Sequence, residues 1–409
     1  MKNFLKTYKS TIILLAAIIV GAIIGIVFGE KAAVLSPLGD IFLNLMFVAI
    51  VPLIFVTITS SISKMKQPKR LGKIMATIVA VFVITSLVAV LIGLASTYAF
   101  KLVETEDGEQ IKASLESDEE VESEELSILE RTVSVLTVKD FSGLLSKSNI
   151  IALLVVSVLT GLAINMSGEK GKPVQEFLVS ANEVVFNFIK IIMYYAPIGL
   201  GAYFAALVGT YGASIAVGYA KTFVIYTVVC ILFYVIFYSL YAFIAAGKKG
   251  VKAFWGSVIP TTLTALATCS SAASIAVNVE ASKKIGVSDD IAETLIPLGT
   301  SFHKDGSIIG SVFKIMFLVC LFGTSVSVFK VLLVALLVTL LITAVPVGGG
   351  TISEMMILTM MGFPVAALPI LTIIATIIDA PATVLNVVGD TASSMLAARI
   401  VDGKDWMKE

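Results

Sequence analysis

The chain has 409 residues, of which 57% are hydrophobic and 14% are charged. Ordinary soluble domains contain about 45–50% apolar and about 25% charged residues, so this composition excludes a soluble globular enzyme and a disordered protein. The 29 Lys and Arg residues balance the 29 Asp and Glu residues, which leaves no net basic field to attract nucleic acid. One histidine and three cysteines without metal-ligand spacing exclude a multi-histidine metal site and a disulfide framework.

Six apolar segments in the first 250 residues are long enough to cross a bilayer, for which about 20 apolar residues are needed. They lie near residues 11–28, 38–62, 73–100, 148–166, 178–208 and 216–246. Basic clusters precede the first segment and follow the second, fourth and sixth. Because Lys and Arg are retained in cytoplasmic loops, these clusters predict a multi-pass cell-membrane protein with a cytoplasmic N-terminus.

The connection between the third and fourth segments is strongly acidic. Residues 104–130 include twelve Asp and Glu side chains, on the side opposite to the basic clusters. Charge blocks of this kind rarely pack, so we expect a solvated external loop. A role in attracting cations is the alternative.

After residue 250, polar clusters interrupt the apolar segments. Two segments broken by Gly, Ser and Pro, near 253–283 and 328–360, each precede a long segment with a polar centre. Such paired interruptions indicate a transporter binding site. Ser270 and Ser271 lie where the first segment would turn, and their hydroxyl and N–H groups suit a carboxylate. Pro346 and Gly348 lie at the expected tip of the second, where glycine permits close backbone approach. Small-residue packing and a plain turn are the respective alternatives.

The sequence SFHKDGS at 301–307 places His303, Lys304 and Asp305 within a segment that is otherwise apolar from 291 to 322. Irregular polar backbone at membrane depth is tolerated only where it is buried in protein or lines a wet cavity. These residues are therefore candidates for a binding site. The alternative is a buried Lys304–Asp305 ion pair, which would need an unwound turn because sequence neighbours do not face each other on a helix.

Asp379, Thr383, Asn386 and Asp390 are spaced four, three and four residues apart, which forms one polar stripe on a helix. Carboxylate, hydroxyl and amide oxygens suit an ammonium group and hard cations. Hydrogen bonding between helices is the alternative, chiefly for Thr383. Thr85 and Ser86 in the third segment offer further oxygens, although hydroxyls are common in membrane helices.

With these residues in place, the chain resembles the dicarboxylate/amino acid:cation symporter family, the glutamate transporter homologues, over nearly its whole length. The resemblance rests on an ordered set of motifs. These are FLNLMFVAIVPLIFVTITSSISKM at 42–65, MYYAPIG at 193–199, the serine-containing hairpin, PLGTSFHKDGS at 297–307, the glycine-rich hairpin and NVVGD at 386–390.

The resemblance implies an all-α integral membrane protein with eight transmembrane helices and two re-entrant hairpins. It implies a homotrimer with an elevator mechanism and both termini in the cytoplasm. Residues 1–247 would hold helices one to six, of which one, two, four and five form the scaffold, with an acidic loop over about 104–147. Residues 248–409 would form the transport core. Its parts are hairpin 1 (about 253–283), broken helix 7 (about 289–322), hairpin 2 (about 328–360) and helix 8 (about 365–403).

By motif matching, the resemblance assigns two sets of site residues. The substrate set would place Asp379 on the amino group of an amino acid, and its members are Ser270, Ser271, Pro346, Gly348, Asp379, Ala382, Thr383 and Asn386. The cation set is Thr85, Ser86, His303, Lys304, Asp305, Asn386 and Asp390. Asp305 and Asp390 would be the Na+ ligands if the protein is sodium-coupled. No cofactor is expected beyond Na+ or H+ as the coupling ion.

Two departures from the family pattern bear on substrate and coupling. Members that take acidic amino acids resemble one another in an arginine at the position of Ala382, and Cys269 offers no substitute. An unpaired side-chain carboxylate would cost about 3–5 kcal/mol, so a neutral amino acid is the predicted substrate. The alternative is an acidic amino acid or dicarboxylate bound by Lys304.

The second departure is SFHKDGS, because the family usually reads NMDGT there. A lysine beside a cation site could occupy the place of one ion, and a histidine could carry a proton. Phe82 also lacks the hydroxyl of an aromatic position near a family ion site. Coupling to either Na+ or H+ therefore stays open. A channel would need a file of like residues, and an intramembrane enzyme a base near its nucleophile, so both are weaker alternatives.

Overall fold

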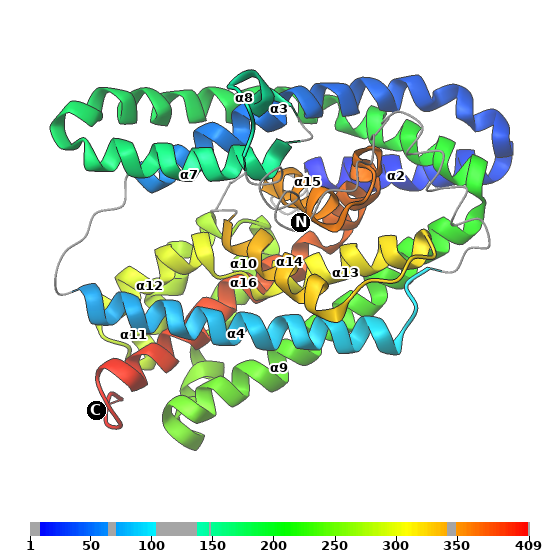
Figure 1. Cartoon of the computed structure of the whole chain (residues 1–409). Coiled ribbons are helices and arrows are strands. Elements are labelled where there is room, and N and C mark those ends of the chain that lie inside the picture. Colours follow the sequence, from blue (N-terminus) through cyan, green and yellow to red (C-terminus); the bar gives the residue numbers. More distant parts are fainter. Residues whose placement is uncertain (1–8, 64–70, 104–136, 147–148, 342–348, 408–409) are drawn as a thin grey trace.

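The computed structural model describes residues 9–63, 71–103, 137–146, 149–341 and 349–407. Within these ranges every regular element is a helix (Figure 1). Helices suit a membrane because they satisfy their backbone hydrogen bonds internally. The all-helical class is thus confirmed for the described residues, whereas the eight crossings and two re-entrant hairpins stay a prediction. The acidic stretch 104–130 lies outside these ranges.

Four helices from the first half of the chain form one layer, at the top in Figure 1. They are α2 (Lys9–Phe28), α3 (Ser36–Ser63), α7 (Ile150–Met166) and α8 (Lys172–Tyr211). Helix α8 packs along both α2 and α3, and α7 packs on α3. An added Cβ at Gly21 of α2 would lie 2.3 Å from the Gly201 carbonyl oxygen of α8. Small residues at this crossing therefore set the distance between the two helices.

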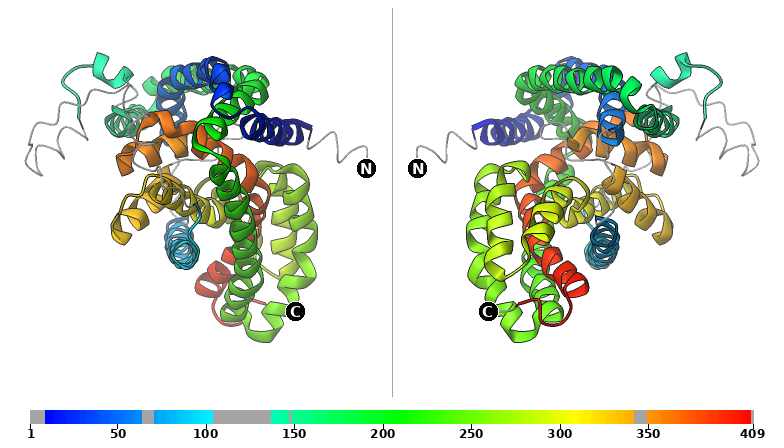
Figure 2. Two further views of the ribbon diagram at one scale, coloured as in Figure 1. Left: turned by 90° about the vertical axis from the view of Figure 1, so that its right-hand side faces the viewer. Right: turned by 90° about the vertical axis from the view of Figure 1, so that its left-hand side faces the viewer.

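A second group of helices surrounds α16 (Leu368–Val401), which contacts most of them. Figure 2 shows α16 running alongside α9, below the layer of α3 and α8. Residues 382–395 of α16 are all buried, as expected for a helix covered on every side. The other members are α4 (Leu71–Ala99), α9 (Ala213–Ser257), α10 (Ile259–Thr268), α11 (Ile275–Ile285), α12 (Asp289–Phe302), α13 (Asp305–Leu321), α14 (Val328–Leu341) and α15 (Gly349–Met361).

Helices of the second group are interrupted at several points. Helix α9 is bent at Ala246 and Gly247, whose backbone angles are not helical. A turn containing the 3-10 helix Ala272–Ser274 separates α10 from α11, and Cys269 there has a φ of 46°, in the left-handed region. Helices α12 and α13 are separated by His303 and Lys304. Helices α14 and α15 flank residues 342–348, which are outside the described ranges.

Four of the described helical stretches are long and apolar enough to cross a membrane, or five if the bent pair 168–192 and 194–210 is counted as one. Helices also lie at each of the six segments that hydropathy marked. Large apolar side chains on their outer surfaces are exposed, among them Val27, Ile231 and Phe243. A bilayer is the environment in which such a surface needs no further cover.

Candidate functional site

The polar centre of the molecule is built at the break between α12 and α13. Helix α12 ends where the His303 N–H donates to the Gly299 carbonyl oxygen at 2.9 Å. Helix α13 then begins at Asp305, so a carboxylate occupies its first turn. A carboxylate at a helix N-terminus is favoured by the helix dipole. The break thus delivers His303 and Asp305 to the interior of the second group of helices.

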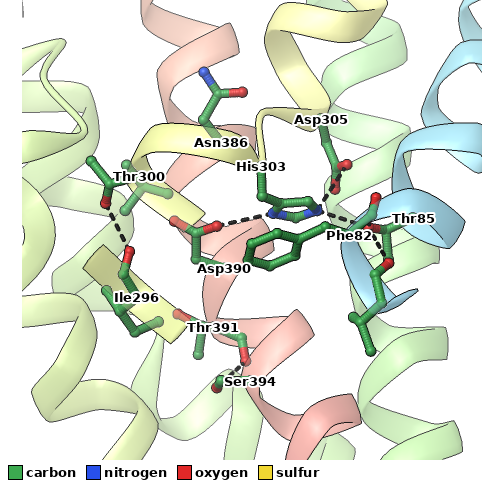
Figure 3. A network of polar contacts seen from close by, with 12 residues as sticks. Phe82, Thr85, Ile296, Thr300, His303, Asp305, Asn386, Asp390, Thr391 and Ser394 are labelled. Carbon is green, nitrogen blue, oxygen red and sulfur yellow. Dashed lines mark hydrogen bonds and ion pairs between the residues drawn. The ribbon is translucent and has the colours of Figure 1, made fainter. Parts of the chain in front are cut away.

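His303 is fully buried and contacts polar groups from three helices (Figure 3). Its Nδ1 lies 2.9 Å from Oδ1 of Asp390 on α16. Its Nε2 lies 2.8 Å from Oγ1 of Thr85 on α4 and 3.2 Å from Oδ1 of Asp305. The Phe82 ring stacks on the imidazole with centroids 4.4 Å apart. The imidazole therefore lies between the two carboxylates that were predicted as cation ligands.

Asp305 has a second contact on α9. The Tyr238 hydroxyl lies 3.2 Å from Asp305 Oδ2 and 2.7 Å from the Leu385 carbonyl oxygen. The buried hydroxyl of Ser86 has no hydrogen-bond partner among the described residues, and the contact of Asp305 Oδ1 is the ion pair with His303. A buried polar atom without a partner costs about 1–3 kcal/mol, so the packing around this cluster must offset that cost.

Two glycines allow the break to approach α16 closely. An added Cβ at Gly299 would lie 2.2 Å from Asp390 Oδ1. An added Cβ at Gly306 would lie 2.3 Å from the Ala382 carbonyl oxygen. Any larger residue at either position would push α12 or α13 away from α16. The polar contacts of His303 thus depend on glycine at both positions.

Lys304 does not take part in the polar contacts that its neighbours His303 and Asp305 make. Its side chain is half-buried and forms no hydrogen bond or ion pair with any residue that the structure describes. The buried Lys304–Asp305 pair considered from the sequence does not form, because Asp305 contacts His303 and Tyr238 instead.

The stripe on α16 passes through two different environments. Asp390 and Asn386 are buried, and Asn386 is held by Ser307 in the first turn of α13. The Asn386 amide nitrogen donates to Ser307 Oγ at 3.0 Å, and its oxygen accepts from the Ser307 N–H at 3.1 Å. Thr383 and Ala382 are also buried.

Asp379, by contrast, is exposed and forms no hydrogen bond or ion pair with the described residues. It lies near Lys314 of α13, Tyr226 of α9 and Cys269. The Asp379 carboxylate is therefore available to a ligand.

The turn after α10 carries the two serines predicted at the first hairpin. Ser270 and Ser271 are both half-buried. The Ser274 hydroxyl donates to the Ser270 carbonyl oxygen at 3.0 Å, which closes the turn. Since Cys269 in the same turn lies near Asp379, the turn is close to the Asp379 end of the stripe. Pro346 and Gly348 lie outside the described residues.

An ion pair that the sequence analysis missed joins three helices of the core. Lys314 Nζ of α13 lies 3.1 Å from Glu354 Oε1 of α15, with side chains 8% and 1% exposed. The Thr372 hydroxyl of α16 donates to Glu354 Oε2 at 2.8 Å. Lys314 and Glu354 are each the single charge in an apolar segment of the sequence. A lone charge at membrane depth needs a partner, so this pattern could have predicted the pair.

Among the residues that the structure describes, no group of three or more His, Cys, Asp or Glu side chains is arranged to hold a metal ion. This statement includes His303, Asp305 and Asp390. Their mutual contacts are hydrogen bonds and ion pairs between the side chains.

Comparison with known proteins identifies relatives over almost the full length. The family model described as the sodium:dicarboxylate symporter family matches residues 11–400. The chain is 27% identical to the proton/sodium-glutamate symport protein of Bacillus caldotenax over 93% of each chain. It is 28% identical to the C4-dicarboxylate transport protein of Pseudomonas syringae pv. tomato, over 98% of this chain and 88% of the relative. It is also 28% identical to the C4-dicarboxylate transport protein 2 of Pseudomonas aeruginosa strain UCBPP-PA14, over 98% of this chain and 92% of the relative.

Proposed function

Since the chain belongs to the sodium:dicarboxylate symporter family, we propose that it carries a neutral amino acid into the cell, together with a cation, by an elevator mechanism. The family consists of transporters, so the chain is a cation-coupled symporter of a membrane and not an enzyme. The bacterial origin of the relatives supports a plasma-membrane location.

The exposed carboxylate of Asp379 is the observation that carries the amino-acid assignment. It lies near Lys314 and the turn at Cys269, while residues 382–395 further along the same helix are buried. A carboxylate at membrane depth is costly unless it has a partner or reaches water. The ammonium group of an amino acid would supply that partner, and the hydroxyl and N–H groups at Ser270 and Ser271 would bind the substrate carboxylate.

The environment of Ala382 favours a neutral side chain on the substrate. Ala382 provides no charge, and Lys314, which lies near Asp379, is paired with Glu354. A substrate side-chain carboxylate buried here without a partner would cost about 3–5 kcal/mol.

An acidic substrate bound by Lys304 is the second candidate, and two observations favour it. The relatives are named for glutamate and C4-dicarboxylates. Lys304 forms no ion pair with the described residues, so its ammonium group is available to an anion.

The division of the helices into two packed groups supports an elevator. In this proposal α2, α3, α7 and α8 form the scaffold of a homotrimer, and α4, α9 and the helices around α16 move with the substrate. Extensive packing within each group lets each act as a rigid unit. The basic clusters in the sequence support cytoplasmic termini.

Uptake by the full-length protein in proteoliposomes tests the proposal. The panel contains neutral amino acids, glutamate, aspartate and C4-dicarboxylates, each measured with Na+ and H+ gradients imposed. We expect accumulation of neutral amino acids. No uptake of any compound under any gradient would reject amino-acid symport, and uptake of dicarboxylates alone would reject the neutral substrate.

Two variants separate the substrate classes. Ala382→Arg should shift preference towards acidic amino acids, because it adds a cation beside Asp379. Lys304→Met should leave neutral uptake intact. If acidic substrates are transported and Lys304→Met removes that activity, the second candidate is correct.

A further inference from the structure

We infer that His303 takes the place of a coupling cation between Asp305 and Asp390, so that this pair of carboxylates does not bind Na+ during transport. The inference rests on the proposed symport, because it concerns the ion that would accompany the substrate.

The imidazole connects the two carboxylates directly. One ring nitrogen contacts Asp390 at 2.9 Å and the other contacts Asp305 at 3.2 Å. Figure 3 shows the ring lying between the two side chains, with Asp390 at one edge and Asp305 at the other. A cation bound by both carboxylates would have to occupy the volume that now contains the ring.

The short ligand distances of hard cations leave no room for a cation between the two carboxylates while the imidazole is there. Such ions hold their oxygen ligands at about 2.3–2.6 Å, as calcium does, and need several oxygens around one centre. Here the oxygen of Thr85 that could join the two carboxylates is itself bonded to His303 at 2.8 Å. Among the described residues, no group of three or more His, Cys, Asp or Glu side chains is arranged to hold a metal ion.

The ring cannot easily leave this position. It has no exposed surface, Phe82 stacks on one of its faces, and the backbone at residue 303 is fixed by a hydrogen bond to Gly299. Gly299 in turn is pressed against Asp390, so movement of either residue disturbs the other. Because His303 is part of the chain, it stays with the carboxylates when the substrate is released, unlike a dissolved ion.

Further ionisable groups, Tyr238, Tyr241 and Lys304, lie around the pair. Tyr238 contacts Asp305 from α9, and Lys304 acts on the charge of Asp390. Together with His303, they surround the two carboxylates with protein groups from α9 and the helix break.

The test measures the unfolding temperature of the purified full-length protein in NaCl and in KCl at equal ionic strength. The wild-type protein should show no Na+-specific stabilisation that depends on Asp390. His303→Asn removes the ring and adds an amide oxygen, so this variant should gain stabilisation that is specific to Na+. Ser393→Ala, on the same helix as Asp390, is the matched control and should respond as wild type does.

If Na+ raises the unfolding temperature of the wild-type protein, Asp390→Asn shows whether the ion binds at the Asp305–Asp390 pair or elsewhere. A Na+-specific stabilisation that Asp390→Asn abolishes would overturn the inference. A response that persists in Asp390→Asn would support it, since the ion then binds elsewhere. A folded His303→Asn that remains insensitive to Na+ would also overturn the statement that the ring excludes the ion.

If His303→Asn does not fold, the effect of Na+ on the unfolding temperatures of wild type and Asp390→Asn still shows whether the pair binds the ion. The measurement needs no transport, so failure of the proposed function in the uptake assay and failure of this inference are separate results.

Discussion

Replacing Lys314 with methionine should destabilise the protein by about 3–5 kcal/mol, because it leaves the Glu354 carboxylate buried without a counter-charge. The magnitude follows from the structure: the two charges are 3.1 Å apart and the side chains are 8% and 1% exposed. The remaining hydrogen bond, from Thr372 at 2.8 Å, cannot neutralise a carboxylate. Reversible unfolding in mixed micelles measures the change in the free energy of unfolding.

The double variant Lys314→Met with Glu354→Leu distinguishes the loss of the whole ion pair from the cost of leaving one charge buried alone. Replacing a buried ion pair with apolar residues is often neutral or stabilising by about 1–4 kcal/mol, so we expect the double variant to recover most of the loss. Lys284, which is exposed, provides the control, and Lys284→Met should change stability by about 0.5 kcal/mol at most. A Lys314→Met variant as stable as this control would refute the reasoning.

Three further substitutions probe the core, each measured by the same unfolding assay. Gly299→Ala should cost about 1–3 kcal/mol, because the new Cβ would lie 2.2 Å from Asp390 Oδ1. Gly256→Ala is the control and should not destabilise the protein, because a Cβ there would have no atom within 4 Å. Equal losses of stability in the two variants would contradict the close packing at Gly299. Cys269→Gly should stabilise the protein by about 1 kcal/mol, because a φ of 46° is unfavourable for a residue with a Cβ. A loss of stability would show that the contacts of the thiol outweigh this backbone strain. Tyr238→Phe should cost about 1–3 kcal/mol, because it removes the hydroxyl next to the buried Asp305 Oδ2, and no change would mean that water replaces the hydroxyl.

The helices were readily predicted from the sequence because hydropathy is a local property. Apolar segments near 11–28 and 73–100 correspond to α2 and α4, and the polar sequence at 301–307 contains the break between α12 and α13. The same reasoning could not give the number of crossings, because bends such as that at Gly247 leave no mark in hydropathy.

The side-chain contacts of the site depend on residues far apart in the sequence. The sequence identified His303, Asp305 and Asp390 as polar residues at membrane depth, but Asp390 lies 87 positions from His303 and Thr85 lies 218 positions away. Only the packing of α4 and α16 around the break shows that the imidazole connects both carboxylates.

The stripe on α16 illustrates a second limit of the sequence. The spacing placed Asp379 and Asp390 on one face, but eleven residues of helix separate them by about 16 Å. One end is exposed and the other is buried against His303, so a single stripe serves two environments. A helical pattern cannot distinguish these environments because it contains no information on what covers each turn.

Counterflow in proteoliposomes, with the inside loaded with unlabelled compound and a labelled neutral amino acid outside, tests the central claim that Asp379 binds an amino group. Neutral amino acids inside should drive entry of label, C4-dicarboxylates should not because they have no amino group, and Asp379→Ala should abolish the exchange. Since the carboxylate is exposed and has no partner among the described residues, this variant should unfold at the wild-type temperature. Exchange driven only by dicarboxylates, or exchange that persists in Asp379→Ala, would contradict the account.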